Sequence, residues 1–220
     1  MLHIFPRLLE NPRIYELVQC VAGTNALDRC TAPLIATAIG DRRTGVVLDV
    51  GGGTGRARKA WPVEWEYVCL EPDPRKILAV NSGFSRIVAN AADLPIGDGS
   101  VDIVIMRLVA HHLDASVLKR ALRESHRVLR PSGVFLLVEP LWCEERLLSR
   151  LLWRYDIGRH PRTPQLLMQC VATSTEISEV KFFKTFHQFI LIRATKTGIA
   201  DEEDEHVFGG RARIGVRDGL

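Results

Sequence analysis

Short apolar runs alternate along the chain with segments of helical periodicity. Five such runs predict buried parallel strands at 46–50, 65–70, 86–89, 101–106 and 134–138. Two later stretches, 180–186 and 189–194, predict closing strands joined by a tight turn and therefore antiparallel to each other. Because strands and helices alternate with short connections, the pattern predicts an α/β fold with a doubly wound, mostly parallel sheet.

The clearest helix is expected at 115–130, with Asp114 as its N-cap and a stop at 131–133. One face of this helix carries Leu118, Ala121, Leu122, Ser125 and Leu129. Further helices are expected at 74–80 and 141–155.

The two ends of the chain differ from its middle. The segment 12–39 predicts two helices, interrupted at 23–25 and continuing after Pro33. We therefore expect an N-terminal helical cap at 1–40, an α/β domain at 41–197 and a largely disordered polar tail at 198–220.

Composition and charge restrict the function classes. A chain of 220 residues, 46% hydrophobic, can bury the core of one domain, and a dispersed net charge of +3 implies no strong positive field for nucleic acid. Five widely spaced cysteines without a Cys-x-x-Cys pair argue against a disulfide framework or a metal site. With no apolar run near the roughly 20 residues that a membrane helix needs and no signal-peptide pattern, the expected location is cytoplasmic.

A glycine-rich loop follows the first predicted strand and carries the main chemical signal. It runs Asp49-Val50-Gly51-Gly52-Gly53-Thr54-Gly55. Glycines after a buried strand let the chain turn sharply and let a ligand approach the main chain. A phosphate-binding Walker A loop would need Gly-Lys-Ser/Thr after its last glycine, and Arg56-Ala57 stands there. A dinucleotide loop would place the bulky Arg56 where close helix packing needs a small residue. S-adenosylmethionine (AdoMet) fits better, with Asp49 accepting from its ammonium group.

Two further segments extend this site. Glu71 ends the second predicted strand about 20 residues on, where an acid accepts hydrogen bonds from both ribose hydroxyls. The stretch 90–95, which follows the third strand, places polar side chains and amides at the adenine end.

Five ordered motifs resemble those of class I AdoMet-dependent methyltransferases, in particular the ubiquinone/menaquinone C-methyltransferase-like (type 11) subgroup. They are VLDVGGGTG at 47–55, LEPDP at 70–74, NAADLPIGDGSVD at 90–102, MRLVAHHL at 106–113 and ESHRVLRPSG at 124–133. The resemblance covers roughly 46–139. It implies a seven-stranded Rossmann-like sheet with an antiparallel C-terminal strand, N-terminal helices, and transferase activity that converts AdoMet to S-adenosylhomocysteine.

The resemblance also implies a set of cofactor-binding residues. They are Asp49, Gly51, Gly52, Gly53, Gly55, Glu71, Pro72, Asn90, Ala91, Met106 and Arg107. The sequence departs from the family twice. Asn90 stands where the family has an aspartate, although its amide oxygen can still accept from the adenine amino group. The helix after the glycine loop is cut short at 56–60 by Trp61-Pro62.

Two adjacent histidines, His111 and His112, lie near the carboxyl end of the fourth predicted strand and are the candidate general bases. His111 is the nearer of the two to the strand end. A purely structural role for the pair stays open. Arg107 is expected to face the methionine end of the cofactor or the substrate, or to be structural.

The methyl acceptor is expected to be a small molecule, with the methylated atom unresolved among O, N and C. Its contacts are expected from the N-terminal helices and 141–169, which hold Tyr15, Trp142, Trp153, Tyr155 and the basic loop 159–162. An RNA or protein methyltransferase and a non-catalytic AdoMet-binding partner subunit stay open as alternatives. An NAD-dependent enzyme is a weaker one.

Overall fold

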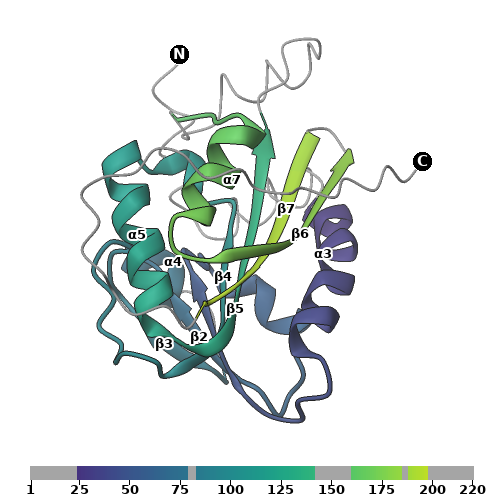
Figure 1. The fold of residues 1–220 in the computed structure, drawn as a ribbon. Helices are drawn as coiled ribbons and strands as arrows, with labels where there is room; N and C mark the ends of the chain where they lie inside the picture. Colours follow the sequence, from purple (N-terminus) through teal and green to yellow (C-terminus); the bar gives the residue numbers. More distant parts are fainter. Residues whose placement is uncertain (1–23, 79–82, 142–159, 185–187, 198–220) are drawn as a thin grey trace.

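The fold is a single twisted sheet with helices on both faces (Figure 1). The computed structural model describes residues 24–78, 83–141, 160–184 and 188–197. Seven strands in these ranges follow the order β3-β2-β1-β4-β5-β7-β6. The order reverses between β1 and β4, so this is a doubly wound sheet, as the hydrophobic pattern predicts.

Five strands pair with one another in parallel, and of the two strands that close the sheet only β7 runs in the opposite direction. The parallel set consists of β1 (Val46–Val50), β2 (Glu66–Leu70), β3 (Ser85–Ile87), β4 (Val101–Arg107) and β5 (Leu129–Leu141). The other two are β6 (Glu176–Lys184) and β7 (Gln188–Thr195), and β7 pairs antiparallel with both β5 and β6. The predicted fold class is therefore confirmed.

Side chains alternate between the two faces of the sheet and form two cores. On β4, Val104 and Met106 join the core under helices α5 (Ala115–Val128) and α7 (Pro164–Ala172). Ile103 and Ile105 join the opposite core, which includes residues of helices α3 (Thr24–Ile39) and α4 (Pro74–Leu78). Strands buried on both faces give the continuous apolar runs that made them visible in the sequence.

Helix α3 differs from the prediction because it begins at Thr24 and runs through Pro33 without a break. Its face carries Leu27, Leu34, Ile35 and Ala38, all buried in the second core. Packing of this face against the sheet overrides the cost of the missing proline N–H.

Helix α5 ends at Val128, two residues earlier than predicted, and Leu129 begins β5. Leu129 is extended and pairs with Val101, so it reaches the core from the sheet and not from the helix face. The predicted N-cap is present, since Asp114 accepts a hydrogen bond from the Val117 N–H at 2.9 Å. The hydrophobic pattern did not predict α7, which Thr163 caps.

Several predictions lie outside the described residues. They are the first of the two N-terminal helices, the helix at 141–155, the tail from 198, and the candidate acceptor residues Tyr15, Trp142, Trp153 and Tyr155. The boundaries at 40 and 197 stay predictions. Among the helices of the described ranges, none is long and apolar enough to cross a membrane.

Candidate functional site

The loops that carry the predicted site residues meet at one edge of the sheet. Val50, at the end of β1, pairs with Leu70 at the end of β2 and with Met106 near the end of β4. The three parallel strands end side by side, where the strand order reverses. In doubly wound sheets this position forms the ligand-binding crevice.

The glycine loop is held in place by β2. The Gly51 and Gly52 N–H groups both donate to the Leu70 carbonyl, at 2.7 and 3.1 Å. Gly51, Gly53 and Gly55 have φ values of 72°, 58° and 71°, in the left-handed region that favours glycine. The loop therefore needs its glycines to form the turn, before any ligand is considered.

Packing around the loop also requires glycine. A Cβ at Gly51 would lie 2.5 Å from Cγ2 of Val109, and a Cβ at Gly55 would overlap the Phe84 ring. The first contact shows that the loop after β1 touches the segment after β4. The short 3-10 helix η1 (Arg56–Ala60) then confirms that the next helix is stunted.

Asp49 lies on β1, two residues before Gly51. Its side chain is buried, and Oδ2 accepts a hydrogen bond from the Tyr67 hydroxyl. Burial raises the pKa of the Asp49 carboxyl, against the opposing effects of Arg107 and the Tyr67 bond. The carboxylate was expected to accept from a ligand ammonium group, and in the structure it accepts from the Tyr67 hydroxyl.

Glu71 stands beside the loop at the end of β2. Its Oε2 accepts from the Gly53 N–H at 3.1 Å, and its Oε1 accepts from the Asp73 N–H at 3.2 Å. Lys76 Nζ lies 3.9 Å from Oε1. A carboxylate offers about four acceptor positions, so these bonds are compatible with two ligand hydroxyls. The neighbouring Pro72 is exposed.

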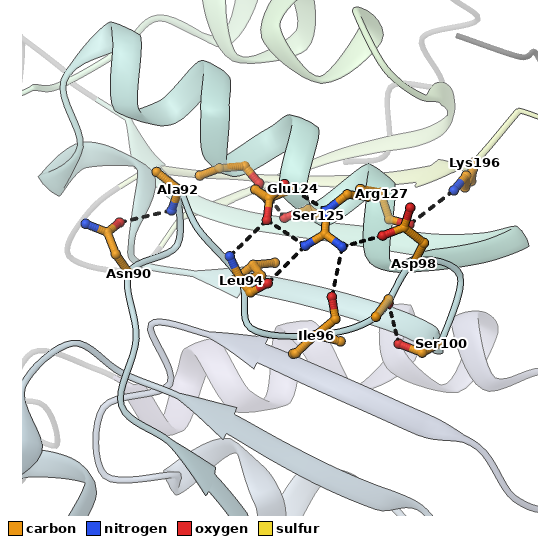
Figure 2. A network of polar contacts seen from close by, with 12 residues as sticks. Asn90, Ala92, Leu94, Ile96, Asp98, Ser100, Glu124, Ser125, Arg127 and Lys196 are labelled. Atoms are coloured by element: carbon orange, nitrogen blue, oxygen red, sulfur yellow. Dashed lines mark hydrogen bonds and ion pairs between the residues drawn. The ribbon is translucent and has the colours of Figure 1, made fainter.

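The loop after β3 is held by a hydrogen bond within the loop and by side chains of α5. Asn90 Oδ1 accepts from the Ala92 N–H at 2.9 Å, and Ala91 is buried. Figure 2 shows Glu124 and Arg127 of α5 reaching this segment. Glu124 accepts from the Leu94 N–H at 2.9 Å.

Arg127 provides the other half of this network. Its guanidinium donates to the carbonyls of Leu94 and Ile96, at 2.9 and 2.8 Å, and pairs with Asp98 at 2.5 Å (Figure 2). One arginine thus fixes three points of the loop that starts at the predicted adenine end. The sequence analysis recorded this helix end as a motif without assigning that task.

Arg107 faces helix α3. Its Nη1 lies 2.6 Å from Oδ1 of Asp28, and Lys59 Nζ lies 2.8 Å from Oδ2 of the same carboxylate. Burial alone would raise the pKa of Asp28, but the hydrogen bonds and charges of Lys59 and Arg107 outweigh it and lower that pKa. Met106 is fully buried in the core, so its side chain is structural and only its main chain lies at the strand end.

The two histidines have different surroundings. His111, in the 3-10 turn η2 (Ala110–His112), is 5% exposed, and its Nδ1 lies 2.7 Å from Oε2 of Glu139. His112 is exposed, with its ring centroid 4.1 Å from that of His111. Glu139, 1% exposed on β5, also accepts from the N–H groups of Val109 and Ala110 through Oε1, both at 2.7 Å. The sequence analysis assigned no role to Glu139.

The turn η2 is also tied to the segment before α7. The buried Arg162 guanidinium donates to the carbonyls of Ala110 and Leu113, and the His160 N–H donates to the His111 carbonyl at 3.0 Å. These two residues belong to the loop that the sequence offered as an acceptor contact. In the structure they support the histidine turn.

Taken together, the arrangement suits an adenosyl ligand. The glycine loop, Glu71 and the loop from Asn90 lie at the ends of β1, β2 and β3, in the order that the methionine, ribose and adenine parts of AdoMet require. In the part of the chain that the structure describes, no group of three or more His, Cys, Asp or Glu side chains could hold a metal ion.

This strand order, with a glycine loop after β1 and an acid after β2, defines the class I methyltransferase fold. Residues 48–137 match the model of the methyltransferase domain family. This part of the chain is therefore a class I AdoMet-dependent methyltransferase domain by its family match and its fold, and the resemblance drawn from its motifs is confirmed.

Individual relatives agree with this assignment. An uncharacterized methyltransferase from Mycobacterium sp. (strain JLS) is 39% identical over 100 residues, which cover 44% of this chain and 39% of the relative. The human thiol S-methyltransferase TMT1A is 36% identical over 108 residues, or 44% of this chain and 43% of that protein. The chain thus spans about two fifths of the length of these curated relatives.

Solved structures show the same fold over more of the chain. A SAM-dependent methyltransferase from Thermotoga maritima, described as a possible histamine N-methyltransferase, superposes with a TM-score of 0.67. The alignment has 22% sequence identity and covers 87% of this chain and 99% of the other. At this identity, the likeness concerns the fold.

Proposed function

We propose that this protein transfers the methyl group of AdoMet to a small-molecule acceptor. The main observation behind the proposal is the position of the Glu71 carboxylate against the glycine loop. This carboxylate holds the Gly53 N–H and stands beside the glycine loop, where it can also accept from ribose hydroxyls. The remaining predicted cofactor contacts are proposed from the main chain of the glycine loop and from the Asn90 loop.

Asp49 and Arg107 have indirect roles in this proposal. Asp49 keeps its bond to Tyr67, which joins β1 to β2 directly before the glycines of the loop. Arg107 keeps its ion pair with Asp28 and ties α3 to the end of β4. Neither role excludes a contact with the methionine end of the cofactor, since a carboxylate and a guanidinium each bond several partners.

His111 is the proposed general base, and His112 is not. The His111 Nδ1 lies against the buried Glu139 carboxylate, as bases do in acyl-transfer triads, whereas His112 is exposed. Bound AdoMet supplies an electrophilic methyl group, so the chain's residues have to orient the acceptor, exclude water and take its proton.

The acceptor is proposed to carry an ionisable proton on sulfur or oxygen, because a base has no task when an unprotonated amine attacks. The human relative is named for a thiol acceptor and the Thermotoga protein for a possible amine acceptor. The shared fold therefore does not choose the acceptor by itself.

Titration calorimetry tests the cofactor half of the proposal. AdoMet and S-adenosylhomocysteine should bind with micromolar dissociation constants and compete with each other, while NADH gives no heat. Radiolabelled methyl transfer from AdoMet to a panel of aryl thiols, phenols and amines then tests the acceptor half. The absence of binding by both adenosyl ligands would contradict the proposal.

A further inference from the structure

Glu139 makes three hydrogen bonds, all to one short turn. Its Oε1 accepts from the Val109 and Ala110 N–H groups, and its Oε2 faces His111 Nδ1. We propose that Glu139 is the positioning residue that holds His111 as the Nδ1–H tautomer, so that Nε2 takes the proton of the methyl acceptor. This inference rests on the proposed function.

The chemistry of the partners determines the tautomer. A carboxylate only accepts hydrogen bonds, and the two backbone N–H groups already donate to this one. At 2.7 Å one proton lies between Nδ1 and Oε2, and an ionised Glu139 requires Nδ1 to carry it. In a neutral imidazole, the lone pair then belongs to Nε2.

The same carboxylate fixes the orientation of the ring. Glu139 is 1% exposed and His111 is 5% exposed, so their bond is shielded from water. Leu108, directly before the turn, has a φ of 60°, which bends the chain away from β4. Because Oε1 holds the turn and Oε2 holds the ring, one side chain sets both the position and the direction of the imidazole.

The turn lies next to the proposed methyl donor. Val109 packs against the Gly51 position of the glycine loop, two residues before His111. Arg162 fastens the turn from the other side through the Ala110 and Leu113 carbonyls. The turn that carries His111 thus contacts both the glycine loop and the segment that precedes α7.

The proposed step balances as a displacement with proton removal. The acceptor's sulfur or oxygen forms a bond to the methyl carbon. The bond between that carbon and the AdoMet sulfur breaks, and its electron pair stays on the AdoMet sulfur, giving S-adenosylhomocysteine. The acceptor's proton goes to Nε2 of His111. The resulting imidazolium is stabilised by the Glu139 carboxylate, as in serine-protease triads.

The first measurement reads the tautomer directly. In the full chain labelled with ¹⁵N-histidine, His111 is assigned by the loss of its signals in His111→Gln and observed where its ring is neutral. The inference expects a protonated Nδ1 and an unprotonated Nε2 in the wild type. A neutral ring protonated at Nε2 would overturn it, without any mutation at position 139.

The second measurement uses Glu139→Gln. The new amide oxygen can still accept from Val109 and Ala110, but the amide NH₂ has to donate to Nδ1 and so moves the proton to Nε2. Glu179→Gln, on strand β6, is the matched control and should leave the His111 signals unchanged. An unchanged tautomer in Glu139→Gln would also overturn the inference.

Kinetics separate this inference from the proposed function. With the best thiol or phenol of the panel, Glu139→Gln should lower kcat about a hundredfold, the usual scale of general-base catalysis. The AdoMet dissociation constant should stay within about twofold, because the cofactor contacts are not altered. Intact AdoMet binding with an unchanged kcat overturns the role of Glu139 alone, whereas loss of AdoMet binding in the wild type overturns the proposed function.

Discussion

Two buried carboxylates stand at matching places on either side of the point where the strand order reverses. Glu71 directly follows β2 and accepts from the loop after the neighbouring strand β1. Glu139 lies near the end of β5 and accepts from the turn after β4, its neighbour. In each case an acid at the end of a flanking strand, β2 or β5, accepts hydrogen bonds from the loop after the adjacent central strand, β1 or β4. The same arrangement therefore occurs twice in the fold.

The two acids differ in what remains available to a ligand. Glu71 is 6% exposed and bonds one N–H of the glycine loop and one of its own turn, which leaves acceptor positions for hydroxyls. Glu139 is 1% exposed and commits its oxygens to three donors of the protein. We therefore expect substitutions at Glu71 to affect mainly binding, and substitutions at Glu139 to affect mainly stability and catalysis.

The largest effect is expected for Glu139→Ala. It leaves two buried N–H groups and a buried imidazole without their acceptor, at about 1–3 kcal/mol for each lost partner. The free energy of unfolding should fall by about 3 kcal/mol or more, measured by urea denaturation. Glu71→Ala should lower the free energy of unfolding by less. Glu176→Ala, at the exposed start of β6, is the control. A larger loss of stability in Glu71→Ala than in Glu139→Ala would contradict the assignment of the stabilising role to Glu139.

The next largest effect concerns the histidine pair. His111→Ala should reduce kcat about a hundredfold, with a nearly constant AdoMet dissociation constant, because a base acts on the acceptor and not on the cofactor. His112→Ala should have a much smaller effect, since His112 is exposed. Steady-state kinetics on both variants decide this, and equal losses would count against His111 as the base.

Glu71→Ala tests the other side of the comparison. Loss of charge-assisted bonds to the ribose should weaken AdoMet binding by about 1–3 kcal/mol, while kcat at saturating AdoMet changes little. Calorimetry is the measurement, and Glu66→Ala, at the exposed start of the same strand, is the control. An unchanged dissociation constant would mean that a different residue holds the ribose.

The smallest effect is expected at the adenine end. Arg127→Ala releases the Leu94 and Ile96 carbonyls, and we expect AdoMet binding to weaken by about 1 kcal/mol through a less ordered loop. Arg130→Ala is the control, because Arg130 pairs with Asp102 near the start of β4, whereas the proposed site lies at the carboxyl ends of the strands. Similar AdoMet dissociation constants for the two variants would show that Arg127 does not contribute to cofactor binding.

The sequence predicted one of the two acids and not the other, for a physical reason. Glu71 belongs to a ligand-binding pattern with a known spacing from the glycine loop. The partners of Glu139 are 28 to 30 residues away in the sequence, and Arg162 bonds a carbonyl 52 residues before it. Side-chain bonds over such separations leave no periodic signal. The available hint was that both acids stand at the ends of buried strands.

The same distinction holds for the fold. Strands buried on both faces were predicted from their apolar runs, and the cap at Asp114 from local hydrogen-bonding chemistry. Helix α3 was divided wrongly because Pro33 breaks helices locally, whereas burial of Leu27 and Leu34 keeps this one continuous. Where a boundary depends on packing against another element, local pattern alone does not locate it.

The contact between Val109 and Gly51 has a consequence for how this sequence can change over time. The loop after β1 and the turn after β4 occupy adjoining space, and an added Cβ at Gly51 would overlap Val109. Because Gly51 also has a φ of 72°, a side chain there is strained even beside a smaller residue at 109, so the shared space limits mainly the size of residue 109. Among related sequences we therefore expect glycine at position 51 and no residue much larger than valine at position 109, although 58 residues separate the two positions in the chain.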